Sequence, residues 1–561
     1  MLLNKTTIAV GLASSLALAA TAAPNDDMAL YQQVIDYLKT STTAVPRPLS
    51  EYHPVHTVSN YEAIIPPQCY TQTEGMFNPC YVCHQNESPG RENVMNDGAL
   101  QVAYSFSDVG MKNHWANLFE DRSEFVAAIS DAEILDWIDD DNYSDLPSRL
   151  VEDGFEGWVP DLENLHLGAE AFDANGFALD DSDWVAFNYK PLPSTFWPTN
   201  GSTDDVMIRL PEAFRRNTGG ERSIDVYRAN LAIVEAQVKG YERITSLPVD
   251  ESLIGVDLNQ DGSLDIVTEI TRVDGYVGAA SEAFSDSYLY PEGTEFLHTV
   301  RYVGLDENGN IIPSTRLKEV RYMKKAVAYR KAVYHRGYQL EGYAKEIGQL
   351  PQYQFLGDHG MDNGFGWAIH GFIEDRRGDL RAVTYEENLF CMGCHTSVGS
   401  TIDKTFSFPR KVDGAAGWGY IDLRGMPDAP NKGETLGEIA TYLQRIGGGG
   451  EFRSNPEMQA RWFNEDGTAD LERITAASDV YELITPSPAR ALELNKAYRA
   501  IVAEQDFIYG RDATVEPPAN VYEHIDNETA PTLPANLFFQ WDIRLDWRES
   551  NEIENKVAAS P

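Results

Sequence analysis

The sequence is poor in basic residues and in long apolar runs. Lysine and arginine number 45 against 87 aspartates and glutamates, and the formal net charge is −42. A surface this acidic repels nucleic acid, because both carry negative charge. We therefore expect no nucleic-acid partner, and we expect any partner protein to be cationic. No segment of the mature chain approaches the roughly 20 consecutive apolar residues that a membrane span requires, so we expect no span.

The one marked apolar run lies at the N-terminus and is too short to span a membrane. Residues 8–20 follow Lys5, and Ala20-Thr21-Ala22 forms a cleavage site of the A-x-A type. This pattern predicts a secretory signal peptide over residues 1–22. No cysteine lies near the cleavage site, so we expect no lipid anchor. We predict a mature chain beginning at about Ala23, periplasmic or secreted.

Cysteine is scarce as well, and its placement is specific. Four of the five cysteines lie in two copies of C-x-x-C-H, at residues 80–84 (the first motif) and 391–395 (the second motif). This spacing is the attachment signature of haem c, in which two thiols bind the vinyl groups and the following histidine binds the iron. The sequence therefore predicts two covalently bound haem c groups. The predicted binding residues are Cys80, Cys83, His84, Cys391, Cys394 and His395.

Other uses of paired cysteines fit the sequence less well. A zinc site built from two C-x-x-C pairs usually keeps them close together, but here the first motif ends at residue 84 and the second begins at residue 391. A thioredoxin-like pair needs a βαβ setting and no histidine after the second cysteine. The fifth cysteine, Cys69, is either a small buried residue or a neighbour of the first haem.

The second axial position of each iron would determine its chemistry. A protein histidine or methionine there gives a six-coordinate electron carrier, whereas an open position gives a catalyst. A lone histidine or methionine is also commonly a packing residue. The candidates are His53, His56, Met95, Met111 and His114 for the first haem, and His359, Met361, His370 and Met426 for the second.

A second motif of possible metal ligands lies in the middle of the chain. Oxygen-bearing side chains alternate over residues 257–265, and Gly262 permits a tight bend. Such oxygen ligands suit Ca²⁺. The pattern departs from an EF-hand because its twelfth position is Thr268, and the glutamate, Glu269, comes one residue later. The alternative is a plain Asp-Gly turn. The predicted calcium ligands are Asp257, Asn259, Asp261 and Asp265.

One basic cluster interrupts the acidic sequence. It contains a single glutamate, Glu319. Internal pairing with the acidic remainder of the chain would explain it, and so would a place for haem propionates or an anionic partner. Its basic residues are Arg316, Lys318, Arg321, Lys324, Lys325, Arg330, Lys331 and Arg336.

We predict an α+β fold, with helical and loop-rich haem-binding segments at both ends around a β-rich middle region. Predicted strands cover 264–270 and 296–302, with a hairpin turn at 306–310. Predicted helices begin with a capping box at Ser130 and cover 435–446, 455–463 and 488–504. The predicted divisions are a signal peptide (1–22), an N-terminal haem segment (23–183), a β-rich region with the calcium loop (184–350) and a C-terminal haem segment (351–561).

The two motifs and the export signal together make the chain resemble bacterial di-haem c-type cytochromes. The resemblance implies single-electron transfer between redox partner proteins, in the periplasm or at the cell surface. A second hypothesis is a di-haem oxidoreductase of peroxidase or oxygenase type, with one open five-coordinate haem. A third is a non-redox binding protein whose haems are structural. Because no Gly/Ser-rich linker separates the motifs, we also expect both to lie in one shared core.

Overall fold

The computed structural model describes residues 64–86, 97–103, 106–193, 197–347, 352–395, 398–447, 455–530 and 532–547. The predicted signal peptide, His53, His56 and Met95 lie outside these residues.

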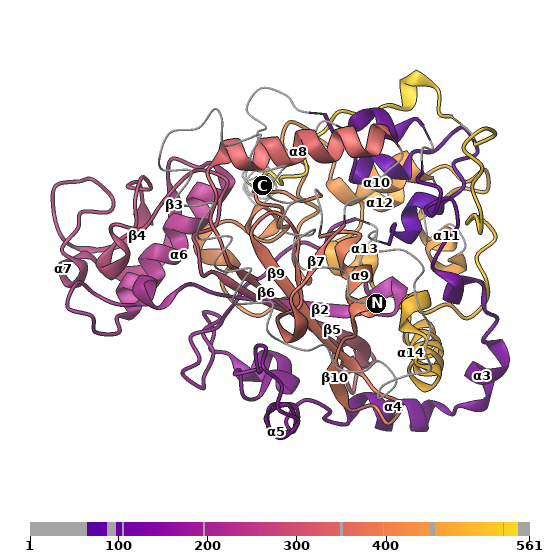
Figure 1. Cartoon of the computed structure of the whole chain (residues 1–561), viewed down its shortest axis with the longest axis horizontal. Helices are drawn as coiled ribbons and strands as arrows, with labels where there is room; N and C mark the ends of the chain where they lie inside the picture. Colours follow the sequence, from indigo (N-terminus) through magenta and orange to yellow (C-terminus); the bar gives the residue numbers. More distant parts are fainter. Residues whose placement is uncertain are drawn as a thin grey trace, which may run out of the picture.

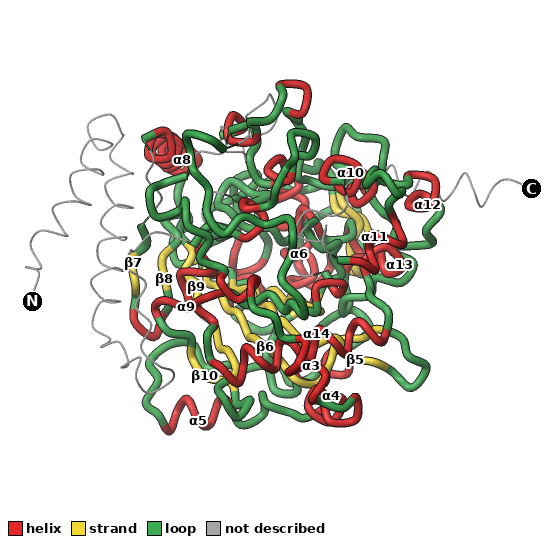
Figure 2. The backbone as a smooth tube through the Cα atoms, turned by 90° about the vertical axis from the view of Figure 1, so that its right-hand side faces the viewer, coloured by secondary structure: helices red, strands yellow, loops and turns green. Residues whose placement is uncertain are grey.

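An antiparallel sheet runs through the centre of the molecule (Figures 1 and 2). Its strands follow the order β1-β2-β5-β6-β9-β8-β7, and β10 pairs with β9. The two longest strands, β5 and β6, form a hairpin closed by a turn in which Asp306 accepts the amide of Asn310. This confirms the predicted turn. The strands are β1 Val185–Ala186, β2 Thr203–Arg209, β5 Glu295–Leu305, β6 Ile311–Lys325, β7 Gln354–Phe355, β8 Met361–Asp362, β9 Trp367–Glu374 and β10 Leu380–Ala382.

A smaller lobe projects from the sheet at the left of Figure 1. It joins α6 (Ile224–Lys239), α7 (Glu251–Ile254) and the two-stranded sheet of β3 (Ile244–Asp250) and β4 (Ile266–Ile270). Almost every residue of α6 after its first turn is buried. The lobe thus carries the predicted calcium loop, which lies between α7 and β4.

Helices surround the sheet. The N-terminal ones are α3 Ser123–Ala128, α4 Asp131–Asp139 and α5 Leu146–Glu152, and the later ones are α8 Lys331–Glu346, α9 Tyr385–Met392, α10 Glu438–Ile446, α11 Pro456–Trp462, α12 Leu471–Thr475, α13 Val480–Ile484 and α14 Pro488–Glu504. The predicted cap is present, because Ser130 accepts the amide of Glu133 at 3.2 Å. Helix α14 has the predicted bounds. Helix α10 begins at Glu438, after the predicted start.

Short 3₁₀ helices connect many of these elements. They are Pro67–Tyr70, Pro79–Val82, Gly98–Gln101, Ala116–Phe119, Leu165–Ala171, Pro198–Asn200, Glu212–Arg215, Gly278–Ala280, Gly357–His359, Phe408–Arg410, Gly414–Gly417, Phe507–Tyr509 and Ala535–Leu537. Within the described part of the chain, no helix has both the length and the apolar character needed to cross a membrane.

The fold therefore mixes helix and strand around a sheet-rich middle, as predicted. Strands β9 and β10 lie beyond residue 350, where the β-rich region was predicted to end. One apolar core includes Ile64, strands of the middle region, Met392 and Ile508. Ile64, at the start of the described chain, thus shares a core with the sheet, whereas Trp541 and Trp547 near its end pack in a second core. The division into domains stays a prediction.

Candidate functional site

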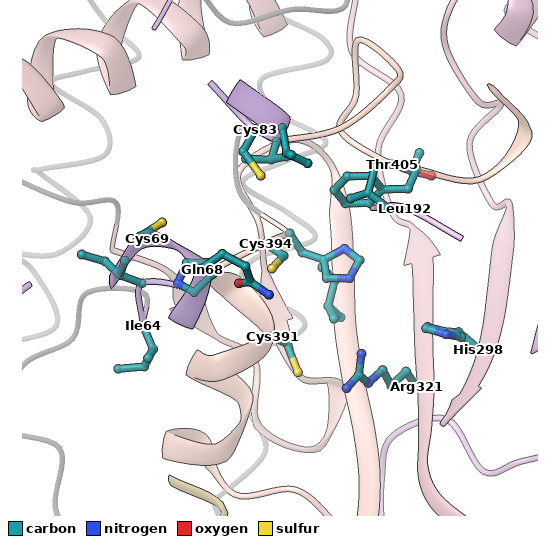
Figure 3. Close-up of a pocket in the computed structure, with 18 of the residues that line it drawn as sticks. Ile64, Gln68, Cys69, Cys83, Leu192, His298, Arg321, Cys391, Cys394 and Thr405 are labelled. Atoms are coloured by element: carbon teal, nitrogen blue, oxygen red, sulfur yellow. The ribbon is translucent and has the colours of Figure 1, made fainter. Parts of the chain in front are cut away.

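Both C-x-x-C-H motifs line one cavity of about 300 Å³, although they lie far apart in the sequence. A single water needs only ~10–15 Å³ on this measure, so the cavity is large. Figure 3 shows Cys83, Cys391 and Cys394 around it, with His298 and Arg321 reaching in from the sheet. Both motifs thus lie at one cavity, as expected, but not in one core, because Tyr81 and Val82 pack in one apolar core and Cys391 and Met392 in another. All six predicted attachment residues line the cavity: Cys80, Cys83, His84, Cys391, Cys394 and His395.

The first motif is held by the residues between and before its cysteines. Asn78 caps the 3₁₀ helix Pro79–Val82 by accepting the amide of Tyr81 at 3.1 Å. The ring of Tyr81 packs edge-on against Trp541, whose indole donates to the Tyr81 carbonyl at 2.7 Å. Because Tyr81 is anchored in the core, the cysteines on either side of it are left at the cavity wall.

His84 is oriented by a carboxylate that sequence reasoning missed. Its Nδ1 lies 2.9 Å from Oδ2 of Asp97, and the other oxygen of Asp97 accepts the amide of Gln85 at 3.2 Å. A carboxylate only accepts hydrogen bonds, so Nδ1 carries a hydrogen, and in the neutral imidazole Nε2 has the lone pair. Histidines that bind metals are commonly fixed in this way. His84 would therefore offer Nε2 to a metal.

The second motif lies at the C-terminal end of α9. This helix begins with a capping box between Thr384 and Glu387. Burial would raise the pKa of Glu387, but Arg381, which binds both carboxylate oxygens at 2.8 and 2.9 Å, holds that pKa at about 2. Gly393, inside the motif, packs directly on the chain that leads to the first motif. A Cβ at Gly393 would lie 2.0 Å from the carbonyl oxygen of Ile64, so only glycine fits there.

His395 has a different environment from His84. Its Nδ1 is buried and has no hydrogen-bond partner among the described residues. Burial lowers the pKa of His395 to about 3, and the positive charges of Arg321 and His298 contribute. The imidazole is therefore neutral and keeps a lone pair for a ligand bond. One motif thus has an anionic neighbour and the other a cationic one.

Strands β5, β6 and β9 supply the facing wall of the cavity. His298 on β5 lies opposite Arg321 on β6 in the strand register. Nε2 of His298 lies 3.3 Å from Asp204, and burial raises the pKa of Asp204. His298 was not predicted, because only strand pairing brings it to the cavity, and nothing in its flanking sequence marks it.

The predicted distal ligands have mixed placements. His370 on β9 lines the cavity. His114 and Met426 do not, and Met426 is 4% exposed within a separate apolar core beside Trp462. Met111, His359 and Met361 are likewise not among the lining residues. The role of His370 as an iron ligand stays a prediction.

The lining of this cavity combines apolar walls with the cysteines of both motifs. Its walls are largely apolar, and burial raises the pKa of the thiols of Cys80 and Cys394 to about 12 and about 11. Among the described residues, no three histidine, cysteine, aspartate or glutamate side chains gather as a metal site. Cys69 also lines this cavity.

The predicted calcium loop is ordered by its own hydrogen bonds. Asp257 accepts the amides of Asp261 and Gly262 at 3.2 and 2.9 Å. Gly262 has φ +90°, the bend that its position requires. Asn259 and Asp261 hydrogen-bond to each other at 2.8 Å, and the amide of Asp265 donates to Glu251 at 3.1 Å. The turn is thus present, and calcium binding by it stays a prediction.

Comparison with known proteins gives two matches. A family model described as "-like lipoprotein" matches residues 53–481. An "Uncharacterized lipoprotein" from Aquifex aeolicus (strain VF5) is 33% identical over 534 residues, which covers 83% of this chain and 89% of the relative. No solved structure matches.

These matches correct the resemblance to di-haem c-type cytochromes. The family is a lipoprotein family, and a motif of five residues carries attachment chemistry without fixing the fold around it. Electron transfer, the peroxidase- or oxygenase-like alternative and the redox partners were inferred from that resemblance, and they are wrong as assignments. The lipoprotein family indicates an exported, membrane-anchored protein. It therefore does not support the expectation of no lipid anchor, which rested on the lack of a cysteine near the predicted cleavage site. The chain belongs to this lipoprotein family.

Proposed function

We propose that this chain is a non-redox binding protein that holds two haem groups covalently, as structural groups, inside its central cavity. The observation that carries the proposal is that all six attachment residues line one cavity. When bound, the group supplies a rigid, planar, mainly apolar body and an iron that accepts an imidazole nitrogen. Cys80, Cys83, Cys391 and Cys394 would hold the two groups by thioether bonds, each formed when the S–H of a thiol adds across a vinyl group with no leaving group.

The residues around the cavity support this function by position. His84 keeps Nε2 available because Asp97 binds Nδ1. His395 is neutral, so its ring also has a lone pair to donate. A covalently held apolar group in this cavity would bury its apolar lining, and burial of apolar surface stabilises the fold.

The experiment measures covalent haem after expression with the attachment machinery in an exported compartment. A haem stain on a denaturing gel should survive boiling, and quantitation should give two haems per chain. The double variant Cys391→Ala/Cys394→Ala should lose one of them. Cys69→Ala is the matched control, because Cys69 lines the same cavity outside both motifs, and it should keep both. Wild-type protein without covalent haem would refute the proposal.

Location within the exported space is part of the proposal. Covalent haem attachment takes place outside the cytoplasm, so we propose the periplasm or the cell exterior. Cell fractionation with the same haem stain tests this, and stained protein confined to the cytoplasm would contradict it.

A further inference from the structure

A second cavity, of about 190 Å³, adjoins the second motif. It shares Cys391, Cys394, His395 and Arg321 with the first cavity. Its other walls include residues of β6, α14 and 511–516. The second motif therefore lies between two cavities that are both largely apolar, and the second one also has a group of charged side chains in its wall.

Charged residues of both signs line this second cavity, four cations and three carboxylates. One of the cations, Arg490, is paired at 3.2 Å with Glu493, which does not line the cavity. In a chain with a net charge of −42, a cavity with this many cations can attract an anionic ligand. The cations are Lys318, Arg321, Arg490 and Arg511, and the carboxylates are Glu319, Asp512 and Glu516.

Lys318 is the most deeply buried of these cations. Its side chain is 1% exposed, and its Nζ donates to the carbonyl of Gly201 and, at 3.2 Å, to the hydroxyl of Ser202. Nζ also lies 4.1 Å from the ring centre of Tyr498. Within the described ranges, no carboxylate lies at ion-pair distance from it. Burial lowers the pKa of Lys318 to about 7, so about half of these amines are protonated at neutral pH. An anion beside Nζ would favour the protonated form, because an opposite charge stabilises a buried ammonium.

The two guanidinium groups nearby share one carboxylate. Arg321 and Arg511 both bind Oε2 of Glu319, at 2.8 and 3.0 Å. One negative charge thus serves two cations. Nε of Arg511 is buried and has no partner among the described residues. The phenol oxygen of Tyr498 is also buried without a partner in the described structure. Nε of Arg511 and the hydroxyl of Tyr498 are therefore two hydrogen-bond donors in the cavity wall that a ligand can use.

We propose that the second cavity binds a carboxylate or oxyanion group, held by Lys318, Arg511 and Tyr498. Two sources share this chemistry. One is a free small anion such as acetate or phosphate. The other is a propionate of a haem on the second motif, a source that rests on the proposed function. Either anion would place a negative charge in the cavity that His395 lines.

The experiment titrates whole purified protein with sodium acetate and with sodium phosphate in a calorimeter, against sodium chloride of equal ionic strength. Lys318→Met should weaken anion binding by about 10- to 100-fold, because methionine is similar in length to lysine but has no charged hydrogen-bond donor. Tyr498→Phe should weaken it less and leave the melting temperature unchanged, because the hydroxyl has no protein partner to lose. Arg377→Gln is the control, since that side chain is 82% exposed and lines neither cavity.

Removal of the second haem distinguishes the two sources. If acetate or phosphate binds to the wild-type protein, the ligand of the second cavity is a free anion. If wild-type protein binds no added anion and the Cys391→Ala/Cys394→Ala variant does, a propionate occupies the site. If neither protein binds acetate or phosphate, the proposal is overturned. The haem stain is read separately, so a failure of haem attachment is not confused with a failure of anion binding.

Discussion

His84 and Asp97 form a buried pair in which Nδ1 of the imidazole lies 2.9 Å from a carboxylate oxygen, with Asp97 only 6% exposed. Nδ1 of His395 has no such partner in the described structure. Burial is the larger cause that lowers the pKa of His395 to about 3, and its positive neighbours add to the shift. The two motifs are identical in pattern, yet their histidines differ as ligands. A carboxylate behind an imidazole raises its basicity, whereas nearby cations lower it.

Asp97→Asn tests the role of this carboxylate. We expect both haems to remain attached, because the thioethers do not involve Asp97. The bond from His84 to iron should weaken by about 10-fold or more, as is typical when such a partner of a metal ligand is removed. The measurement is the concentration of added imidazole that changes the haem absorption spectrum. Asp97→Glu should restore part of the wild-type value, and an unchanged imidazole response in Asp97→Asn would show that Asp97 has only a structural role.

Glu387 gives a pH prediction at the base of the second motif. Burial opposes its charge, but Arg381 keeps the folded-state pKa at about 2, below the ~4.3 of an unfolded chain. The pair therefore stabilises the fold above about pH 4.3, and this stabilisation is lost as the pH falls towards 2. Glu387→Gln should cost ~3–5 kcal/mol at pH 7, because it leaves Arg381 buried without its counter-charge.

Denaturant unfolding at pH 7 and at pH 3 checks this prediction. The difference between wild type and Glu387→Gln should be smaller at the lower pH. Glu472→Gln, a first-turn glutamate on the exposed side of α12, is the control and should change little at either pH. An equal loss of stability at both values would contradict the assigned pKa.

Local features of the sequence were predicted well, because short-range chemistry determines them. The capped start of α4 at Ser130, the 306–310 hairpin turn and both ends of α14 follow from side-chain caps and turn residues. The attachment residues were likewise visible, since C-x-x-C-H is a contiguous pattern. Its flanks, however, carry no information about the sheet that packs against it, and so the family assignment was wrong.

The rest of the site depends on contacts between distant segments. Asp97 pairs with His84 from a position 13 residues further along the chain, a spacing that belongs to no motif, and His298 meets the cavity only through the pairing of β5 with β6. The basic cluster was ambiguous for the same reason. In the structure Arg316, Arg321 and Lys325 pair internally with Glu374, Glu319 and Asp403. Lys318, on the same strand, has no such pair in the described residues, and no sequence pattern separates it from its neighbours.

The calcium prediction for residues 257–265 is tested by chelation. If the loop binds Ca²⁺ only when folded, calcium at 100 times its dissociation constant adds roughly 2.7 kcal/mol, and a chelator should remove it. Asp261→Ala should abolish the response of the melting temperature to the chelator. Asp466→Ala is the control, because Asp466 caps another exposed turn by accepting the amide of Thr468. If the wild-type melting temperature is the same with and without the chelator, the loop is a plain Asp-Gly turn that binds no metal.

Gly393 makes the sharpest prediction about how the two motifs are held together. Its Cα faces the carbonyl of Ile64 so closely that an added Cβ would lie 2.0 Å from that oxygen and 3.5 Å from Pro66. Backbone cannot move aside cheaply, so Gly393→Ala should separate the second motif from the segment before the first. We expect a loss of ~1–3 kcal/mol in the free energy of unfolding, as for other overpacked sites.

The control is Gly342→Ala in α8, where a Cβ would meet nothing within 4 Å. There alanine should stabilise the protein by ~0.5–1 kcal/mol, because glycine costs a helix more conformational entropy than alanine does. Urea unfolding of both variants, compared with wild type, gives the two values. Equal stability of Gly393→Ala and wild type would mean that the second motif does not pack on Ile64, and the shared position of the two motifs at one cavity would then be in error.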